Sequence, residues 1–179
     1  LKLETTGASN QVTLDHTLGT LSNPFSVRFL VRAESTQNNT FIQLLDQGGT
    51  EFARIGIMVG GQFAHWIISP PSYVNIVAMT ASIWYWVRMD IDPVTDTWSV
   101  YIYDTDGDLL ASKANIAAIN GPATTINTIK LTTGDTDAVA RISYWSDLSV
   151  VYKKNSTLVY ETDFDDYDWG KSTSERINS

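Results

Sequence analysis

The stretch WYWVRMDIDPVTDTWSVYIYDTDGDLL, residues 84–110, decides the fold. Apolar residues recur at every second position over 85–91, and the same period resumes over 98–102 after a short acidic turn that contains a proline. A period of two is typical of a β-strand with one face toward a core. A second turn at 104–108, in which Gly107 can adopt a positive φ angle, leads into another strand. The stretch therefore predicts three consecutive antiparallel strands.

The alternate positions of the first two strands carry rings and a guanidinium group. These positions are Trp86, Arg88, Tyr101 and Tyr103. Aromatic rings offer flat apolar surfaces to the C–H groups of sugars, and an arginine offers a planar fork of donors to hydroxyls or carboxylates. We therefore expect a ligand-binding face here. The alternative is that a second layer or a long loop covers this face, in which case the rings belong to the core.

Length and composition favour one globular domain. The chain has 179 residues, 43% of them hydrophobic, with six Trp, eight Tyr and six Phe, which is ample for a sizeable core. A net charge of −8 argues against nucleic acid and anionic membranes as partners, because both favour basic surfaces. The absence of cysteine excludes disulfides and thiolate metal sites, and it fits either a cytosolic protein or a bacterial secreted one.

No stretch of the sequence resembles a membrane span, which needs about 18 or more apolar residues. The first residues, LKLETT, do not form a charged and then apolar leader. We therefore expect that any signal peptide has been removed.

The rest of the chain alternates short apolar runs with turn residues, and no helical period continues for a dozen residues. The predicted strands are weak edge runs at 1–3 and 12–14, then 25–31, 41–46, 52–59, 62–68, 126–131 and 140–152. Gly60 and Gly61 predict a tight hairpin turn between 52–59 and 62–68. The prolines of 69–72 predict a loop that continues through Tyr73 and Asn75.

Two later segments are predicted as connections. Residues 115–120 form either one turn of helix or a crossing connection, ended by Gly121 and Pro122, and residues 132–137 form a turn. Strands at this spacing predict an all-β fold, a two-sheet antiparallel β-sandwich of the jelly-roll type, over residues 1–152. Residues 153–179 are either a returning strand with Leu158 and Tyr160 inward, followed by a polar tail, or the start of a linker to a neighbouring domain.

Four segments of the chain carry a resemblance to a known superfamily. They are FSVRFLV, FARIGIMVGGQFAHWII, the hairpin WYWVRMDIDP with WSVYIYDTDGDLL, and YWSDLSVV. Their order and texture resemble the concanavalin A-like lectin/glucanase superfamily in its laminin-G-like form, over residues 1–152. The resemblance implies a polysaccharide-binding module attached to the catalytic domain of a glycan-degrading enzyme, in a secreted or cell-surface protein of bacterial origin.

The sequence offers little for catalysis. Glycan hydrolases of this superfamily carry paired carboxylates on one central strand, and the nearest match, Glu161, Asp163 and Asp165, follows the last convincing sandwich strand. A lyase would need a His or Tyr base beside an arginine; His65, Arg54 and Tyr144 are the candidates, but no spacing links them. His65 shares its parity with apolar neighbours, which favours an interior histidine. We therefore expect no enzyme activity, with a glycoside hydrolase or polysaccharide lyase as the distant alternative.

Two segments are candidates for calcium. Asp104, Asp106 and Asp108 lack the spacing and closing glutamate of a calcium loop, so a hairpin turn explains them better. The resemblance implies a second candidate, a structural calcium ion held between Glu4 near the first strand and Asp147 in the last.

The arginines suggest the ligand. Five of the six fall in predicted strands, although the chain is acidic; these are Arg28, Arg32, Arg54, Arg88 and Arg141. An arginine beside a ring can bind a carboxylate while the ring stacks on the sugar, so we expect a glycan ligand, with uronate-containing chains slightly favoured. Alternatively, these arginines pair with Asp46, Asp90 or Asp92. Further candidate ligand-binding residues are Arg54, Trp66, Tyr73 and Trp145. A structural or adhesive domain that binds protein is the competing function.

Overall fold

The computed structural model describes residues 1–5, 11–123, 125–134, 141–152 and 158–162, the last of these as backbone only. This part of the chain consists of strands and turns. It contains no helix that could span a membrane. The described residues form 13 strands: β1 (Lys2–Thr5), β2 (Val12–Leu21), β3 (Phe25–Ala33), β4 (Thr40–Leu45), β5 (Glu51–Met58), β6 (Gln62–Ile68), β7 (Pro71–Ala78), β8 (Trp84–Asp92), β9 (Thr97–Tyr103), β10 (Leu109–Ala117), β11 (Ile126–Thr133), β12 (Arg141–Tyr152) and β13 (Leu158–Thr162).

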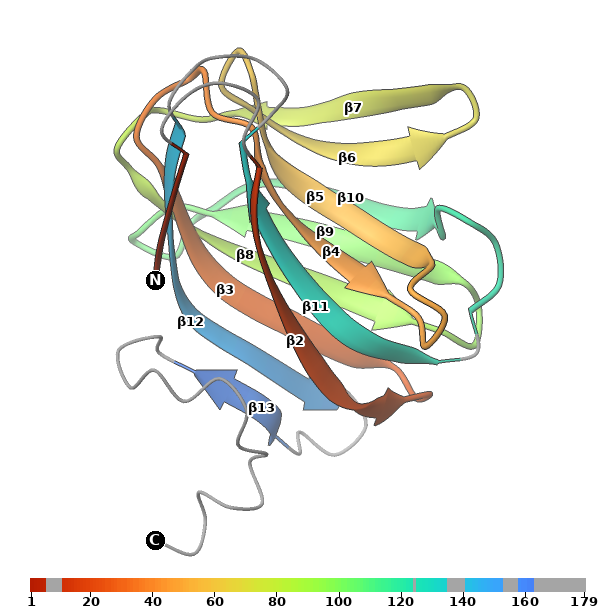
Figure 1. The fold of residues 1–179 in the computed structure, drawn as a ribbon. Coiled ribbons are helices and arrows are strands. Elements are labelled where there is room, and N and C mark those ends of the chain that lie inside the picture. The colour runs from red at the N-terminus through yellow and green to blue at the C-terminus, as the bar shows by residue number, and fades with distance from the viewer. Residues whose placement is uncertain (6–10, 124, 135–140, 153–157, 163–179) are drawn as a thin grey trace, which may run out of the picture.

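Two antiparallel sheets pack face to face (Figure 1). The seven-stranded sheet has the order β1-β12-β3-β8-β9-β10, with β13 as a further partner of β12, and the six-stranded sheet has the order β2-β11-β4-β5-β6-β7. The chain passes repeatedly from one sheet to the other. The predicted two-sheet antiparallel sandwich is therefore confirmed.

The core lies between the sheets and follows the alternation seen in the sequence. In β8 the burial pattern alternates strictly after Trp86, so that Val87, Met89 and Ile91 point inward. Rings from the two sheets meet there: the centroids of Phe63 in β6 and Tyr85 in β8 are 5.2 Å apart. Each such large apolar side chain contributes about 1.5–3 kcal/mol when it is fully buried.

The glycine hairpin between β5 and β6 forms as predicted. Gly60 and Gly61 have φ angles of 94° and 67°, and the amide of Gly61 donates to the carbonyl of Met58 over 3.0 Å. Both residues thus adopt the left-handed conformation that glycine accepts without steric cost.

The predicted loop around the two prolines is wrong in part. β6 ends at Ile68, and β7 begins at Pro71, which pairs with Ile68. Tyr73 and Asn75 therefore lie in a strand and not in a loop. The proline is tolerated because β7 is the edge strand of the six-stranded sheet, where a missing amide donor disrupts no ladder on the outer side.

Two other predicted boundaries were wrong. The strand β10 continues to Ala117, with a register shift between Lys113 and Ile116 and a φ angle of 54° at Asn115, so no helical turn forms there. The strand β11 continues to Thr133, where the sequence predicted a turn. In β10 exposed residues continue the strand on either side of this irregularity, whereas the last two residues of β11, both threonines, are buried.

The outer edge of β12 is shared by two strands. Residues 141–144 pair with β1, and residues 148–151 pair with β13. The backbone of 158–162 therefore returns to the sandwich. The predicted inward direction of Leu158 and Tyr160, and the tail 163–179, lie outside what the structure describes.

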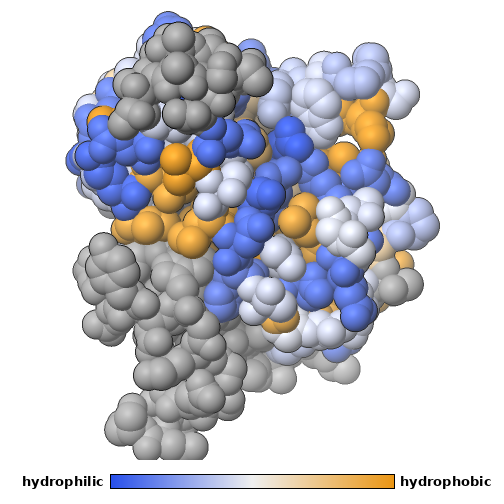
Figure 2. Space-filling view, viewed as in Figure 1, coloured by the Kyte–Doolittle hydropathy of each residue, from blue (hydrophilic) through white to orange (hydrophobic). Residues whose placement is uncertain are grey.

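The outer face of the six-stranded sheet is largely polar near its β2 edge. The outward residues of β2 include Thr13, Asp15 and Thr17, and Figure 2 shows a hydrophilic band that crosses the strands of this face obliquely. The outer face of the seven-stranded sheet lies on the opposite side of the sandwich, and it carries the rings that the sequence singled out.

Candidate ligand-binding face

Four of the predicted ligand-binding residues come together on the outer face of the seven-stranded sheet. Trp86 of β8 lies opposite Tyr103 of β9, and Arg88 lies opposite Tyr101. Directly opposed residues of an antiparallel pair project to the same face. Because the intervening residues are buried, the alternation that builds the core also places these four side chains outward.

The neighbouring strands extend this pattern into two rows that run across the sheet. The apolar row consists of Leu30, Trp86, Tyr103 and Leu109, from β3, β8, β9 and β10. The arginine row consists of Arg28, Arg88 and Tyr101, from β3, β8 and β9. Trp86 is 37% exposed and Leu109 is 53% exposed, so a second layer does not cover these two side chains.

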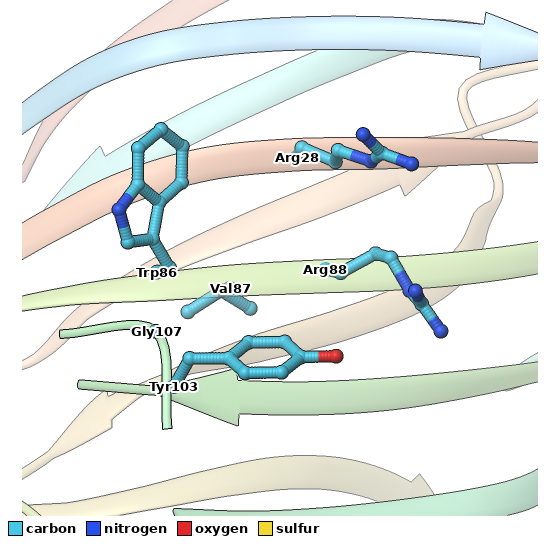
Figure 3. Close-up of a pocket in the computed structure, with 6 residues that line it drawn as sticks. All are labelled: Arg28, Trp86, Val87, Arg88, Tyr103 and Gly107. Carbon is cyan, nitrogen blue, oxygen red and sulfur yellow. The ribbon is translucent and has the colours of Figure 1, made fainter. Parts of the chain in front are cut away.

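A hollow of about 320 Å³ lies over these rows. Its volume is at the lower end of the range of small-molecule sites, about 300–1,000 Å³. The lining residues are Arg28, Trp86, Val87, Arg88, Tyr103 and Gly107 (Figure 3). In this view the Trp86 ring and Gly107 lie at one end of the hollow, and both guanidinium groups lie at the other.

The turn between β9 and β10 places Gly107 at the hollow. The carboxylate of Asp104 accepts hydrogen bonds from the backbone amides of Asp106, at 3.0 Å, and Asp108, at 2.9 Å. Gly107 has a φ angle of 89°. The acidic triplet therefore caps a hairpin turn, as the sequence favoured, because one of its carboxylates is already bonded to the backbone.

Arg88 is partly neutralised by its surroundings. Its Nη2 lies 3.3 Å from Oδ2 of Asp90, and its Cζ lies 4.2 Å from the ring centroid of Tyr101. Asp90 also accepts a hydrogen bond of 2.7 Å from the hydroxyl of Ser26. The alternative in which arginines pair with neighbouring aspartates thus holds for Arg88.

Arg28 lies directly opposite Arg88 and differs from it. Its side chain is exposed, and it forms no ion pair with any residue that the structure describes. The sequence placed Arg28 outward but did not place it beside Arg88. The missing information was the strand order, since β3 and β8 are neighbours in the sheet although about sixty residues separate them.

Arg32, at another end of the same face, is enclosed. Its Cζ lies 4.4 Å from the ring centroid of Tyr144 and 5.5 Å from that of Trp84. Its Nη2 lies 2.5 Å from Oε1 of Glu34. An arginine that is held by two rings and a carboxylate has a structural role and offers little to a ligand.

Three other predicted residues, Arg54, Trp66 and Tyr73, form a separate cluster on the outer face of the six-stranded sheet. Arg54 makes two contacts with Glu51, Nε–Oε1 at 2.5 Å and Nη2–Oε2 at 2.6 Å, and donates to the Tyr73 hydroxyl at 3.1 Å. The rings of Trp66 and Tyr73 meet with centroids 4.7 Å apart. Burial acts to lower the pKa of Arg54, but the hydrogen bonds that Arg54 donates to Glu51 and Tyr73 outweigh burial and raise the pKa. This arginine is fully engaged.

Trp145 was predicted to contact a ligand, and this prediction is wrong. The side chain is 2% exposed. Its ring packs against Phe29 with centroids 5.5 Å apart, and its Nε1 donates to the Ser143 hydroxyl at 3.1 Å. Trp145 is therefore part of the core.

The predicted calcium pair does not form one site. Glu4 lies opposite Ile142, which is five residues from Asp147 along β12. At the usual rise of a strand, the backbones of Glu4 and Asp147 are therefore about 16 Å apart. Two carboxylates on one calcium ion each lie within about 2.6 Å of it. Glu4 instead forms an ion pair of 2.6 Å with Lys2. Among the described residues, no group of three or more His, Cys, Asp or Glu side chains could hold a metal.

The residues considered for catalysis lie apart. His65 is 3% exposed and lies between the sheets, as its parity favoured. Arg54 is on the outer face of the six-stranded sheet, whereas Tyr144 stacks with Arg32 on the outer face of the seven-stranded one. No lyase site joins these three residues. Glu161 lies in β13, described as backbone only, and Asp163 and Asp165 lie outside the described residues.

Comparisons with known proteins bear on the fold. No protein-family model and no curated protein matches the sequence. A solved sialidase structure is similar over 86% of this chain, with a TM-score of 0.70 and 15% identity, but this chain spans only 15% of the sialidase chain. The catalytic domain of a GH131 beta-glucanase from Podospora anserina is similar over 88% of this chain and 73% of its own, with a TM-score of 0.56 and 12% identity.

A seed lectin from Lotus tetragonolobus is also similar, over 86% of this chain and all of its own, with a TM-score of 0.52 and 9% identity. At such identities the likeness shows the fold alone. The chain therefore has a β-sandwich fold of the kind found in lectins and glucanases, which agrees with the concanavalin A-like resemblance.

Proposed function

We propose that this chain is a non-catalytic carbohydrate-binding module of a secreted glycan-degrading enzyme, and that it binds a polysaccharide through the apolar row. The observation that carries the proposal is the exposed Trp86 ring beside Tyr103 in a hollow that also contains two guanidinium groups. Such rings bind the C–H faces of sugars, and the guanidinium groups bind their oxygens.

The apolar row suits an extended chain of sugars. Opposed side chains on neighbouring strands are about 4.5–5.5 Å apart at Cβ, so the row from Leu30 to Leu109 is a continuous surface across four strands. The residues belong to a regular sheet and not to loops. Their positions are therefore fixed before binding, which reduces the entropic cost of association.

The similar structures support this proposal by their names, which are those of a lectin, a beta-glucanase and a sialidase. In the sialidase the similar region is a small part of a longer chain, as expected for a module beside a catalytic domain. Most glycosidases use two carboxylates, whereas the described residues that line the hollow are aromatic, cationic or apolar, which suits binding of a sugar.

Affinity electrophoresis of the chain in gels that contain neutral or acidic polysaccharides tests the proposal. We expect retardation by at least one polysaccharide, and we expect Trp86→Ala to weaken it about tenfold. Trp66→Ala is the matched control, because it removes a tryptophan from the outer face of the other sheet. Both variants should be shown to be folded by their melting temperatures.

Three results would count against the proposal. No retardation by any polysaccharide would favour a structural or adhesive domain. A loss of binding in Trp66→Ala alone would move the site to the Arg54 cluster. Release of reducing ends or of unsaturated products would show catalysis.

A further inference from the structure

We infer that the glycan bound by this face carries an anionic substituent, a carboxylate or a sulfate ester, and that Arg28 is the residue that selects it. The inference rests on the proposed function of the face and specifies the class of ligand. Three features carry it: an opposed pair of arginines, the lack of a counter-ion for one of them, and their place relative to the rings.

The first feature is the pairing of like charges. Arg28 and Arg88 are directly opposed on neighbouring strands, on the same face. Like charges at directly opposed positions destabilise a sheet. Burial of the Arg28 side chain does not offset this repulsion, because Arg28 is exposed. An anion bound between the two guanidinium groups would remove the repulsion.

The second feature is the uneven distribution of counter-ions. Arg88 has Asp90 as a partner at 3.3 Å, and its guanidinium stacks on Tyr101. Arg28 has no ion pair with any residue of the described part of the chain. The described lining of the hollow thus holds two positive groups and no carboxylate. Arg28 is therefore the cation of this lining that lacks a described counter-ion, in a chain whose net charge is −8.

The third feature is the spacing between the apolar row and the arginine row along the strands. The apolar row and the arginine row are two residues apart along each strand, about 6–7 Å. The guanidinium groups lie at the far end of the hollow from Trp86 (Figure 3). A sugar ring stacked on Trp86 and Tyr103 would therefore direct a substituent toward Arg28. Carboxylate and sulfate groups both accept hydrogen bonds from an arginine.

The negative net charge of the chain separates specific binding of an acidic glycan from non-specific attraction. At long range a chain of net charge −8 repels polyanions, so non-specific attraction does not favour their binding. Any preference for acidic over neutral glycans must then come from local cations. Lys130 provides a matched control, since it is a cation on the outer face of the six-stranded sheet, 3.9 Å from Asp15.

The experiment compares polygalacturonate with the same polymer after reduction of its carboxyl groups, and dextran sulfate with unmodified dextran. Binding to each is measured by affinity electrophoresis for the original protein and for Arg28→Gln, Lys130→Gln and Trp86→Ala. We expect binding to at least one acidic polymer, at least about tenfold weaker binding to its neutral counterpart, and a loss of about tenfold in Arg28→Gln. Lys130→Gln should bind as the original protein does. The acidic polymer that binds identifies the substituent.

Each contrary outcome has a separate meaning. Equal binding to acidic and neutral polymers, with a loss in Trp86→Ala but not in Arg28→Gln, overturns the anionic ligand and leaves the proposed glycan-binding function standing. Equal losses in Arg28→Gln and Lys130→Gln also overturn it, because they indicate a general effect of charge. Binding to none of the four polymers overturns the inference, and retardation by a neutral polysaccharide outside this set still tests the proposed function.

Discussion

His65 and Trp98 meet edge to face across the sandwich, with ring centroids 5.9 Å apart and an interplanar angle of 86°. His65 comes from β6 and Trp98 from β9, so the contact joins the two sheets. Burial lowers the pKa of His65 below its ordinary value of 6.5; the backbone of Trp66 opposes this change, and the charge of Lys113 adds to it. Burial between the sheets therefore favours the neutral form of this histidine in the folded protein.

The first prediction is a loss of stability in mild acid. The folded state binds a proton at His65 less readily than the unfolded state, so this contribution to stability is complete above pH 6.5 and is lost as the pH falls through the lowered pKa of the folded protein. Urea unfolding at pH values between 5 and 8 measures it. In His65→Leu the dependence on pH should shrink to the part that comes from His16, whose pKa burial also lowers. An undiminished dependence in that variant would contradict the assignment.

The second prediction concerns two glycines in strands. A Cβ atom on Gly56 would lie 2.2 Å from the carbonyl oxygen of Thr40, which is backbone and cannot move aside. Gly56→Ala should lower the free energy of unfolding by about 3 kcal/mol or more. Gly19, in β2, has no atom within 4 Å of the same position, and Gly19→Ala should be neutral or stabilise the fold by up to about 1 kcal/mol. Denaturant unfolding separates the two, and equal effects would refute the close approach.

The third prediction contrasts two arginines in the absence of ligand. Arg54→Gln removes both contacts with Glu51, whose side chain is only 13% exposed, and the bond to Tyr73. We expect a loss of about 2 kcal/mol in the free energy of unfolding. Arg28→Gln removes no partner in the described structure and relieves a repulsion, so it should change stability by less than about 0.5 kcal/mol. A large loss in Arg28→Gln would mean that this arginine has a structural role.

The fourth prediction separates core from ligand contacts. Trp145→Ala should cost about 3–5 kcal/mol of stability, because a buried ring is removed. Trp145→Phe should cost less and leave the hydroxyl of Ser143 with its other contact, Thr40 at 3.0 Å. Isothermal titration with a polysaccharide that the original protein binds should show the same affinity for Trp145→Phe. A weaker affinity would return Trp145 to the ligand site.

The hairpin of residues 84–110 could be predicted in detail because its two faces differ chemically. Strict alternation sorted the inward apolar residues from Trp86, Arg88, Tyr101 and Tyr103, and a short turn fixed their register. Arg28 could not be placed beside them, because no local pattern states which distant strand becomes the neighbour of β8.

The error at Trp145 has a different cause. Leu148 and Val150 point inward, so strict alternation along β12 would direct Trp145 outward. The register shifts between Ser146 and Ser149, with a φ angle of 50° at Asp147, and this bulge reverses the phase of the strand. The sequence contains no glycine at this position from which the bulge could be predicted.

The position of the two rows on a regular sheet separates recognition from folding. Along β8 the outward residues Trp86 and Arg88 alternate with inward residues such as Val87 and Met89, so exchanging Arg88 or Trp86 changes the chemistry of the exposed face while the core keeps its shape. Under the proposed function, substitutions at every second position would change the sugar that this face recognises. New specificities need no new loops.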